Sequence, residues 1–127
     1  MAADLPPELA AFPQGYVDGA NFHHSDHVRV AFEMVRRHDF LEAAQTYARG
    51  LRAIAARAGN PDAYHETITI AFLALIAERA EGFDSYDAFA AANPDVLDKS
   101  VLTRWYAPER LASAAARRTF LLPDRHP

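Results

Sequence analysis

The spacing of apolar residues is the feature that most constrains the fold of this chain. Between residues 25 and 82 they recur three and four positions apart, in alanine-rich stretches without internal proline, and no segment alternates apolar and polar residues. The first spacing marks one face of an α-helix, whereas a half-buried strand requires the alternation. We therefore predict an all-α protein, a compact bundle of three long helices followed by short C-terminal helices.

Turn-forming residues divide the chain into these helices. Prolines and glycines interrupt residues 1–22, which we expect to form an irregular arm. Capping residues, prolines and Gly59 predict long helices over residues 25–38, 40–58 and 62–82, with Asn60 and Pro61 starting the third. Shorter helices are expected after Ser85 and Pro108, and residues 119–127 should form an extended tail.

Length and composition exclude several classes of protein. The 127 residues are enough for one domain, 1–127, with one continuous core. The chain has no cysteine, so it offers no disulfide or thiolate site. No segment approaches the roughly 18 to 20 apolar residues of a membrane span, and the N-terminus lacks the pattern of a signal peptide. We expect a soluble cytoplasmic protein with no membrane partner. A net charge of −4 without a basic stripe argues against nucleic acid as a partner.

Helical-wheel positions place three histidines on inward faces. An α-helix turns by about 100° per residue. In the first long helix, His24 and His27 fall on the same side as the apolar residues, and His65 falls in the middle of the apolar face of the third. We therefore expect His24, His27 and His65 to point into the core, with His23 able to replace His24.

A shared metal ion would explain three inward imidazoles. A single buried histidine is more often a core residue whose ring nitrogens bond a hydroxyl or a carbonyl. Three unpaired rings, however, would each cost roughly 1 to 3 kcal/mol. Two ligands three residues apart, His24 and His27, together with His65 from a facing helix would complete a three-nitrogen set with an open coordination position. Such a set suits one transition-metal ion, namely copper, iron, zinc or nickel, without selecting among them.

Two further side chains are candidates for chemistry at this site. Glu66 falls at the edge of the apolar face, where it could be a fourth ligand or a general base, although acids are also common in the first turn of a helix. Tyr47 brings a hydroxyl to the inner face of the second helix, where it could orient a water or a substrate, or bond a backbone carbonyl.

The sequence also resembles known helical proteins. The stretches HHSDHVRVAF, YHETITIAFLALI, LDKSVLTRWYAPERL and ARRTFLLPD resemble a group of small bacterial all-helical proteins over most of the chain. This resemblance implies that the histidine segments and the C-terminal segments belong to one unit, and it implies no particular activity. Helical-bundle metalloproteins of the DinB type are similar only in architecture, because this chain has HxxH on an early helix where they have HxxxH on a later one.

These observations lead to a metalloenzyme hypothesis. One metal ion held by His24, His27 and His65 would act on a small-molecule substrate, with Glu66 and Tyr47 as catalytic residues and oxidative chemistry favoured over hydrolysis. The alternative is a non-catalytic helical binding or regulatory module in which the histidines are core residues. A third hypothesis is a histidine cluster that senses pH. A homodimer is left open.

Overall fold

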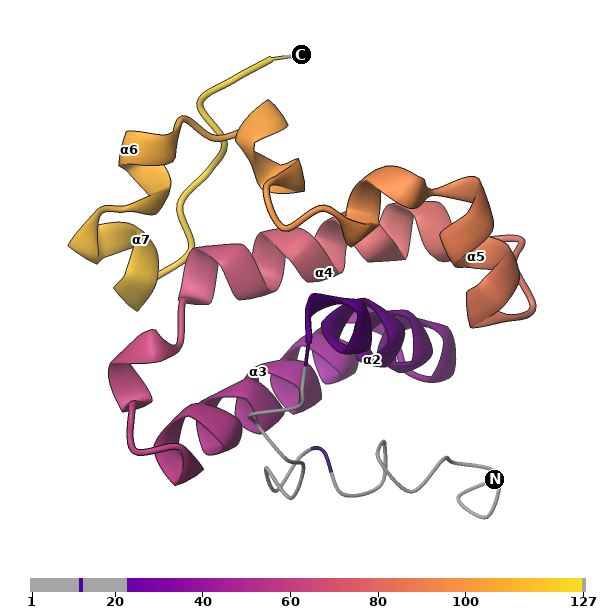
Figure 1. Ribbon diagram of the computed structural model, residues 1–127, viewed down its shortest axis with the longest axis horizontal. Coiled ribbons are helices and arrows are strands. Elements are labelled where there is room, and N and C mark those ends of the chain that lie inside the picture. The colour runs from indigo at the N-terminus through magenta and orange to yellow at the C-terminus, as the bar shows by residue number, and fades with distance from the viewer. Residues whose placement is uncertain (1–11, 13–22, 127) are drawn as a thin grey trace.

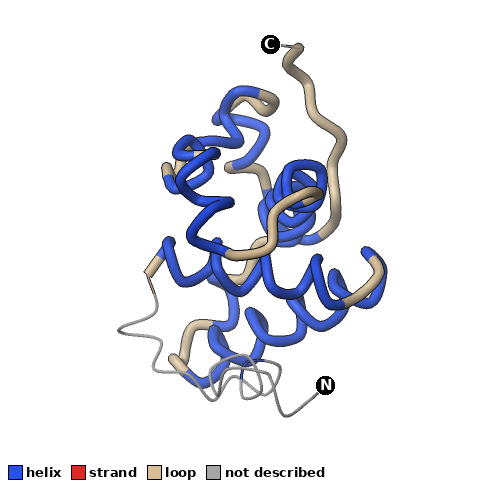
Figure 2. Tube along the Cα trace, turned by 90° about the vertical axis from the view of Figure 1, so that its right-hand side faces the viewer, coloured by secondary structure: helices blue, strands red, loops and turns tan. Residues whose placement is uncertain are grey.

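The structure, a computed structural model, describes Phe12 and residues 23–126, so the predicted arm otherwise lies outside the described residues. Its long helices are α2 (His24–Arg37), α3 (Phe40–Arg57) and α4 (Glu66–Ala80). Three shorter α-helices and three 3₁₀ turns complete it: η4 (Pro61–Ala63), α5 (Tyr86–Ala92), η5 (Pro94–Leu97), η6 (Val101–Arg104), α6 (Pro108–Leu111) and α7 (Ala114–Arg118). No strand occurs among the described residues (Figure 2), which confirms the predicted all-α fold.

Helix α4 occupies the centre of the bundle. Figure 1 shows it crossing the molecule between α2 and α3 on one side and α6 and α7 on the other, and it contacts α2, α3, α7 and η6. Its side chains Leu73 and Ile76 are fully buried, as is Phe32 of α2. Phe32 packs against Phe89 of α5 with ring centroids 4.8 Å apart, which joins the shorter helices to the same core.

Local capping groups set most helix boundaries where the sequence predicts them. The side chain of Asp39 accepts a hydrogen bond from the amide of Glu42 at the start of α3, and Ser85 caps α5 in the same way. Gly59 and Gly82, which follow α3 and α4, have φ angles of 78° and 90°. Only glycine adopts this left-handed backbone without a steric cost, so the two positions end their helices.

The start of the third long helix differs from its prediction. Residues 61–63 form the separate turn η4, Tyr64 and His65 are extended, and α4 begins at Glu66. The Nδ1 atom of His65 accepts a hydrogen bond from the amide of Ile68, at 3.1 Å, so His65 is the N-cap of α4. His65 is 8% exposed, so the inward position expected for it is correct, but it results from the cap and not from a helical face, because a wheel does not apply to a residue outside the helix.

The C-terminal segment after α7 packs back on α4. The hydroxyl of Thr67 donates to the carbonyl of Thr119 at 2.7 Å and accepts from the amide of Leu121 at 3.0 Å. Thr67 is 0% exposed, although a helical wheel of residues 62–82 places it opposite the apolar face of the predicted helix. Tyr106 adds a bond from its hydroxyl to the carbonyl of Leu121, at 2.8 Å. The segment thus covers a face of α4 that the helical wheel assigns to solvent.

None of the described helices combines the length and apolar character that crossing a membrane would require.

Candidate functional site

A pocket of about 820 Å³ lies where α2 and α4 begin, against the second half of α3. Residues of η4 and of the segment around Lys99 complete the wall. The pocket brings together four histidines, His23, His24, His27 and His65, and it therefore includes every histidine predicted to belong to the metal site.

The lining is mostly apolar. Side chains of α3 and α4 supply the greater part of it, with one residue from η6: Leu51, Ile54, Ala55, Ala58, Ile68, Phe72 and Leu102. Apart from the histidines, polar groups come from Tyr47, Tyr64, Thr69, Lys99 and a few small residues. No aspartate or glutamate is among the described residues that line this pocket. A mainly apolar wall with a few polar groups is typical of sites for small organic molecules.

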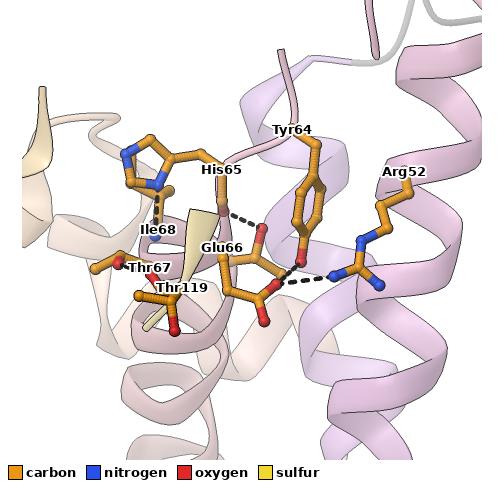
Figure 3. Close-up of polar contacts among 8 residues, drawn as sticks. Arg52, Tyr64, His65, Glu66, Thr67, Ile68 and Thr119 are labelled. Carbon is orange, nitrogen blue, oxygen red and sulfur yellow. Dashed lines mark hydrogen bonds and ion pairs between the residues drawn. The ribbon is translucent and has the colours of Figure 1, made fainter. Parts of the chain in front are cut away.

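His65 is fixed by two hydrogen bonds. Because its Nδ1 accepts from the amide of Ile68, the proton of the neutral ring lies on Nε2, which donates to the carbonyl of Leu111 at 2.7 Å. Figure 3 shows the ring next to the amide of Ile68 at the start of α4. Both ring nitrogens are thus in use, and a metal ion could bind His65 only by displacing one of these bonds.

His24 is held in a similar way. Its Nε2 lies 2.9 Å from the carbonyl of Val96, and its ring packs against Phe72 with centroids 5.4 Å apart. Since a carbonyl only accepts, Nε2 carries the proton. His24 therefore links the start of α2 to η5. His23 precedes it as the exposed N-cap of α2, and its amide donates to the Asp26 carboxylate at 2.9 Å, so Asp26 stabilises the start of the helix.

His27 is the histidine with the most perturbed ionisation. Burial lowers its pKa from 6.5 to about 4, and nearby His24 and Lys99 lower it further against the opposing effect of Asp26. The ring is therefore neutral at pH 7, with one nitrogen able to donate a hydrogen bond and the other able to accept one or to bind a metal ion.

Glu66 and Tyr47 lie in different places. The carboxylate of Glu66 accepts from the Tyr64 hydroxyl at 2.6 Å and from Arg52 at 3.2 Å, as Figure 3 shows. It lines a shallow hollow between α3 and α4 and is not among the residues that line the histidine pocket. Tyr47 lines that pocket and is 2% exposed, and burial raises the pKa of its hydroxyl.

Tyr64 separates the two hollows. It lines the histidine pocket, while its hydroxyl bonds Glu66, which lines the other hollow. Burial raises its pKa to about 12, and the bond to Glu66 contributes to the rise. The guanidinium of Arg52 lies over its ring, 4.7 Å from the centroid. The Glu66 carboxylate, which would have to accept a proton as a general base, is therefore already engaged by Tyr64 and Arg52.

The predicted ligands do not form a ready-made metal centre. Within residues 23–126, no three or more histidine, aspartate or glutamate side chains are placed to hold one ion together. The three-histidine metal centre stays a prediction, and its formation would require rearrangement of at least His65.

Lys99 is the pocket residue that the sequence analysis overlooked. It lies between η5 and η6 and is the only lysine of the chain, which otherwise uses arginine as its cation. The presence of a single lysine among twelve arginines could have drawn attention to this position, because lysine and arginine differ in how they pair with anions.

Comparisons with known protein families, curated proteins and solved structures gave no match to this chain.

Proposed function

We propose that the histidine pocket is a binding site for a small, predominantly apolar organic molecule. The observation that carries the proposal is the pocket itself, about 820 Å³ with aliphatic and aromatic walls and few polar groups. Sites for drug-sized ligands have volumes of about 300 to 1,000 Å³ and the same kind of lining. The proposal follows the alternative that the sequence left open, a non-catalytic binding module.

The apolar wall sets the scale of the expected affinity. Transfer of apolar surface out of water contributes roughly 25 cal/mol for each Å², so a ligand that buries about 300 Å² gains about 7 to 8 kcal/mol. Loss of translational and rotational freedom takes back a large part of this gain. We therefore expect dissociation constants in the micromolar range or weaker.

Binding of an uncharged fluorescent probe tests the proposal. N-phenyl-1-naphthylamine should bind saturably, with one site per chain. Ile68 lines the pocket and is 41% exposed, so Ile68→Trp should fill the pocket without disturbing the core, and it should weaken probe binding at least fivefold. Leu41→Trp is the matched control, because Leu41 is 75% exposed on α3 and does not line the pocket. Unsaturable binding, or equal binding by both variants, would overturn the proposal.

A second candidate function is transition-metal binding by His24, His27 and His65. The observation that favours it is the convergence of these three histidines, together with His23, on one pocket. Copper, iron, zinc and nickel should each be titrated into protein without an affinity tag. The candidate predicts one ion per chain and its loss in His27→Ala, with His38→Ala as control because the ring of His38 faces Glu42 elsewhere on the surface. Absence of stoichiometric binding would overturn it and leave the first proposal standing.

A further inference from the structure

The charges around the pocket indicate which kind of apolar molecule it would take. The chain carries a net charge of −4, yet the described lining residues include a lysine and four histidines and no carboxylate. Because His27 and His65 are neutral, the positive charge comes from Lys99, and a lysine with no acid in the described lining favours an anion over a neutral molecule or a cation. The described lining thus carries a positive charge, whereas the whole chain is negatively charged.

The acidic residues closest to this wall already have partners. Asp26 accepts from the amide of His23, and Asp98 accepts from the amide and the hydroxyl of Ser100 at 2.9 and 2.8 Å. Neither lines the pocket. Glu66 is engaged by Tyr64 and Arg52 on the other side of the Tyr64 ring. These carboxylates therefore reduce the positive potential at the pocket without offering a competing ion pair within it.

The one charged side chain of the described lining, that of Lys99, lies at its solvent edge. Lys99 and His23 are exposed, whereas Phe72, Ala55 and Tyr47 in the same pocket are buried. A ligand with a charged group at one end and an apolar body would place its charge at the solvent edge and its body against α3 and α4. The flexible stem of a lysine suits the first role, since its ammonium can follow the anion while it stays hydrated.

We propose that the pocket binds an amphipathic organic acid, with Lys99 pairing with its anionic group and the apolar walls of α3 and α4 taking its body. This inference rests on the proposed binding function. It adds the chemical class of the ligand and the residue that selects it.

The single lysine permits a direct experiment. Reductive methylation with ¹³C-formaldehyde keeps the positive charge and labels Lys99 as the only side-chain amine, with the α-amine resolved by its different chemical shift. Decanoate should shift the Lys99 methyl signal saturably. Decanol, which has the same apolar body, and acetate, which has only the acid group, should leave it unchanged at equal concentration.

Affinities measured by displacement of the uncharged probe complete the test. Decanoate should bind more tightly than decanol, and Lys99→Gln should weaken decanoate by roughly three- to tenfold while leaving decanol unchanged. Arg118→Gln, which removes an exposed cation on α7, should change neither. Equal affinities for decanoate and decanol, or an unchanged preference in Lys99→Gln, would overturn this inference alone. Failure of every ligand and of the probe to bind would overturn the proposed function as well.

Discussion

Replacement of His65 tests whether this residue is a structural cap or a reserve metal ligand. In His65→Ala the amide of Ile68 loses its acceptor and the carbonyl of Leu111 loses its donor. Loss of an N-cap costs about 0.5 to 2 kcal/mol, and leaving a partly buried partner unsatisfied costs about 1 to 3 kcal/mol. We expect the free energy of unfolding to fall by about 2 to 4 kcal/mol in metal-free protein.

Urea denaturation followed by circular dichroism measures this loss. With a slope of about 2 kcal/mol per molar urea, the midpoint should fall by roughly 1 to 2 M. His65→Asn separates the two bonds, because the asparagine side chain is a good N-cap but is too short to reach Leu111. It should recover about 1 kcal/mol of the loss. His38→Ala, at an exposed helix end, should change stability by less than about 0.5 kcal/mol.

Two results would refute this reasoning. If His65→Ala unfolds at the wild-type urea concentration without metal, the two hydrogen bonds do not stabilise the fold. If His65→Asn is as unstable as His65→Ala, the capping bond to Ile68 contributes nothing and the cost comes from Leu111 alone. A large loss of stability that appears only when the wild type is loaded with metal would instead support the ligand role.

Three further substitutions test other parts of the structure. The pKa of His27 is lowered from 6.5 to about 4, so the free energy of unfolding should fall by up to about 3 kcal/mol as the pH decreases from 6.5 towards 4. Urea titrations should show this loss in the wild type and not in His27→Gln. A Cβ at Gly50 would overlap the ring of Phe12 and lie 2.8 Å from the Phe12 carbonyl oxygen, so Gly50→Ala should lower the melting temperature in spite of its better helix propensity, and a Phe12→Ala background, which removes the ring and keeps the carbonyl, should relieve only part of this loss. Thr67→Val removes both bonds to the C-terminal segment and should cost about 2 kcal/mol and speed tryptic cleavage of that segment, whereas Thr67→Ser should retain near-wild-type resistance.

The sequence predicts those features that depend on neighbouring residues. Asp39 and Ser85 cap the helices that they precede, and Gly59 and Gly82 follow the helices that they end, because a cap or a left-handed turn is determined within about four residues. The third long helix is also the most apolar of the three, which is typical of a helix that is buried on most sides. These features require no knowledge of which segments meet in space.

Features that depend on distant segments could not be predicted. The start of α4 at Glu66 depends on His65, a residue type outside the preferred N-caps, and the ring is oriented by Leu111, 46 positions away. Thr67 is buried by a tail that begins 52 positions later. A helical wheel describes one helix in isolation, so it placed Thr67 in solvent. Lys99 belongs to a short segment without helical periodicity, so nothing local connects it to the pocket.

The metal-ion hypothesis assumes that inward imidazoles need a shared partner, because buried rings without partners are costly. His24 and His65 show that this assumption does not hold. His24 and His65 instead donate to the carbonyls of Val96 and Leu111, and both carbonyls lie in the last turn of a short helical segment, where no intrahelical donor is available. Each pair therefore satisfies two groups that would otherwise lack partners, and it ties a short C-terminal element to the start of a long helix. Histidine serves this purpose because a neutral ring donates through one nitrogen and accepts through the other.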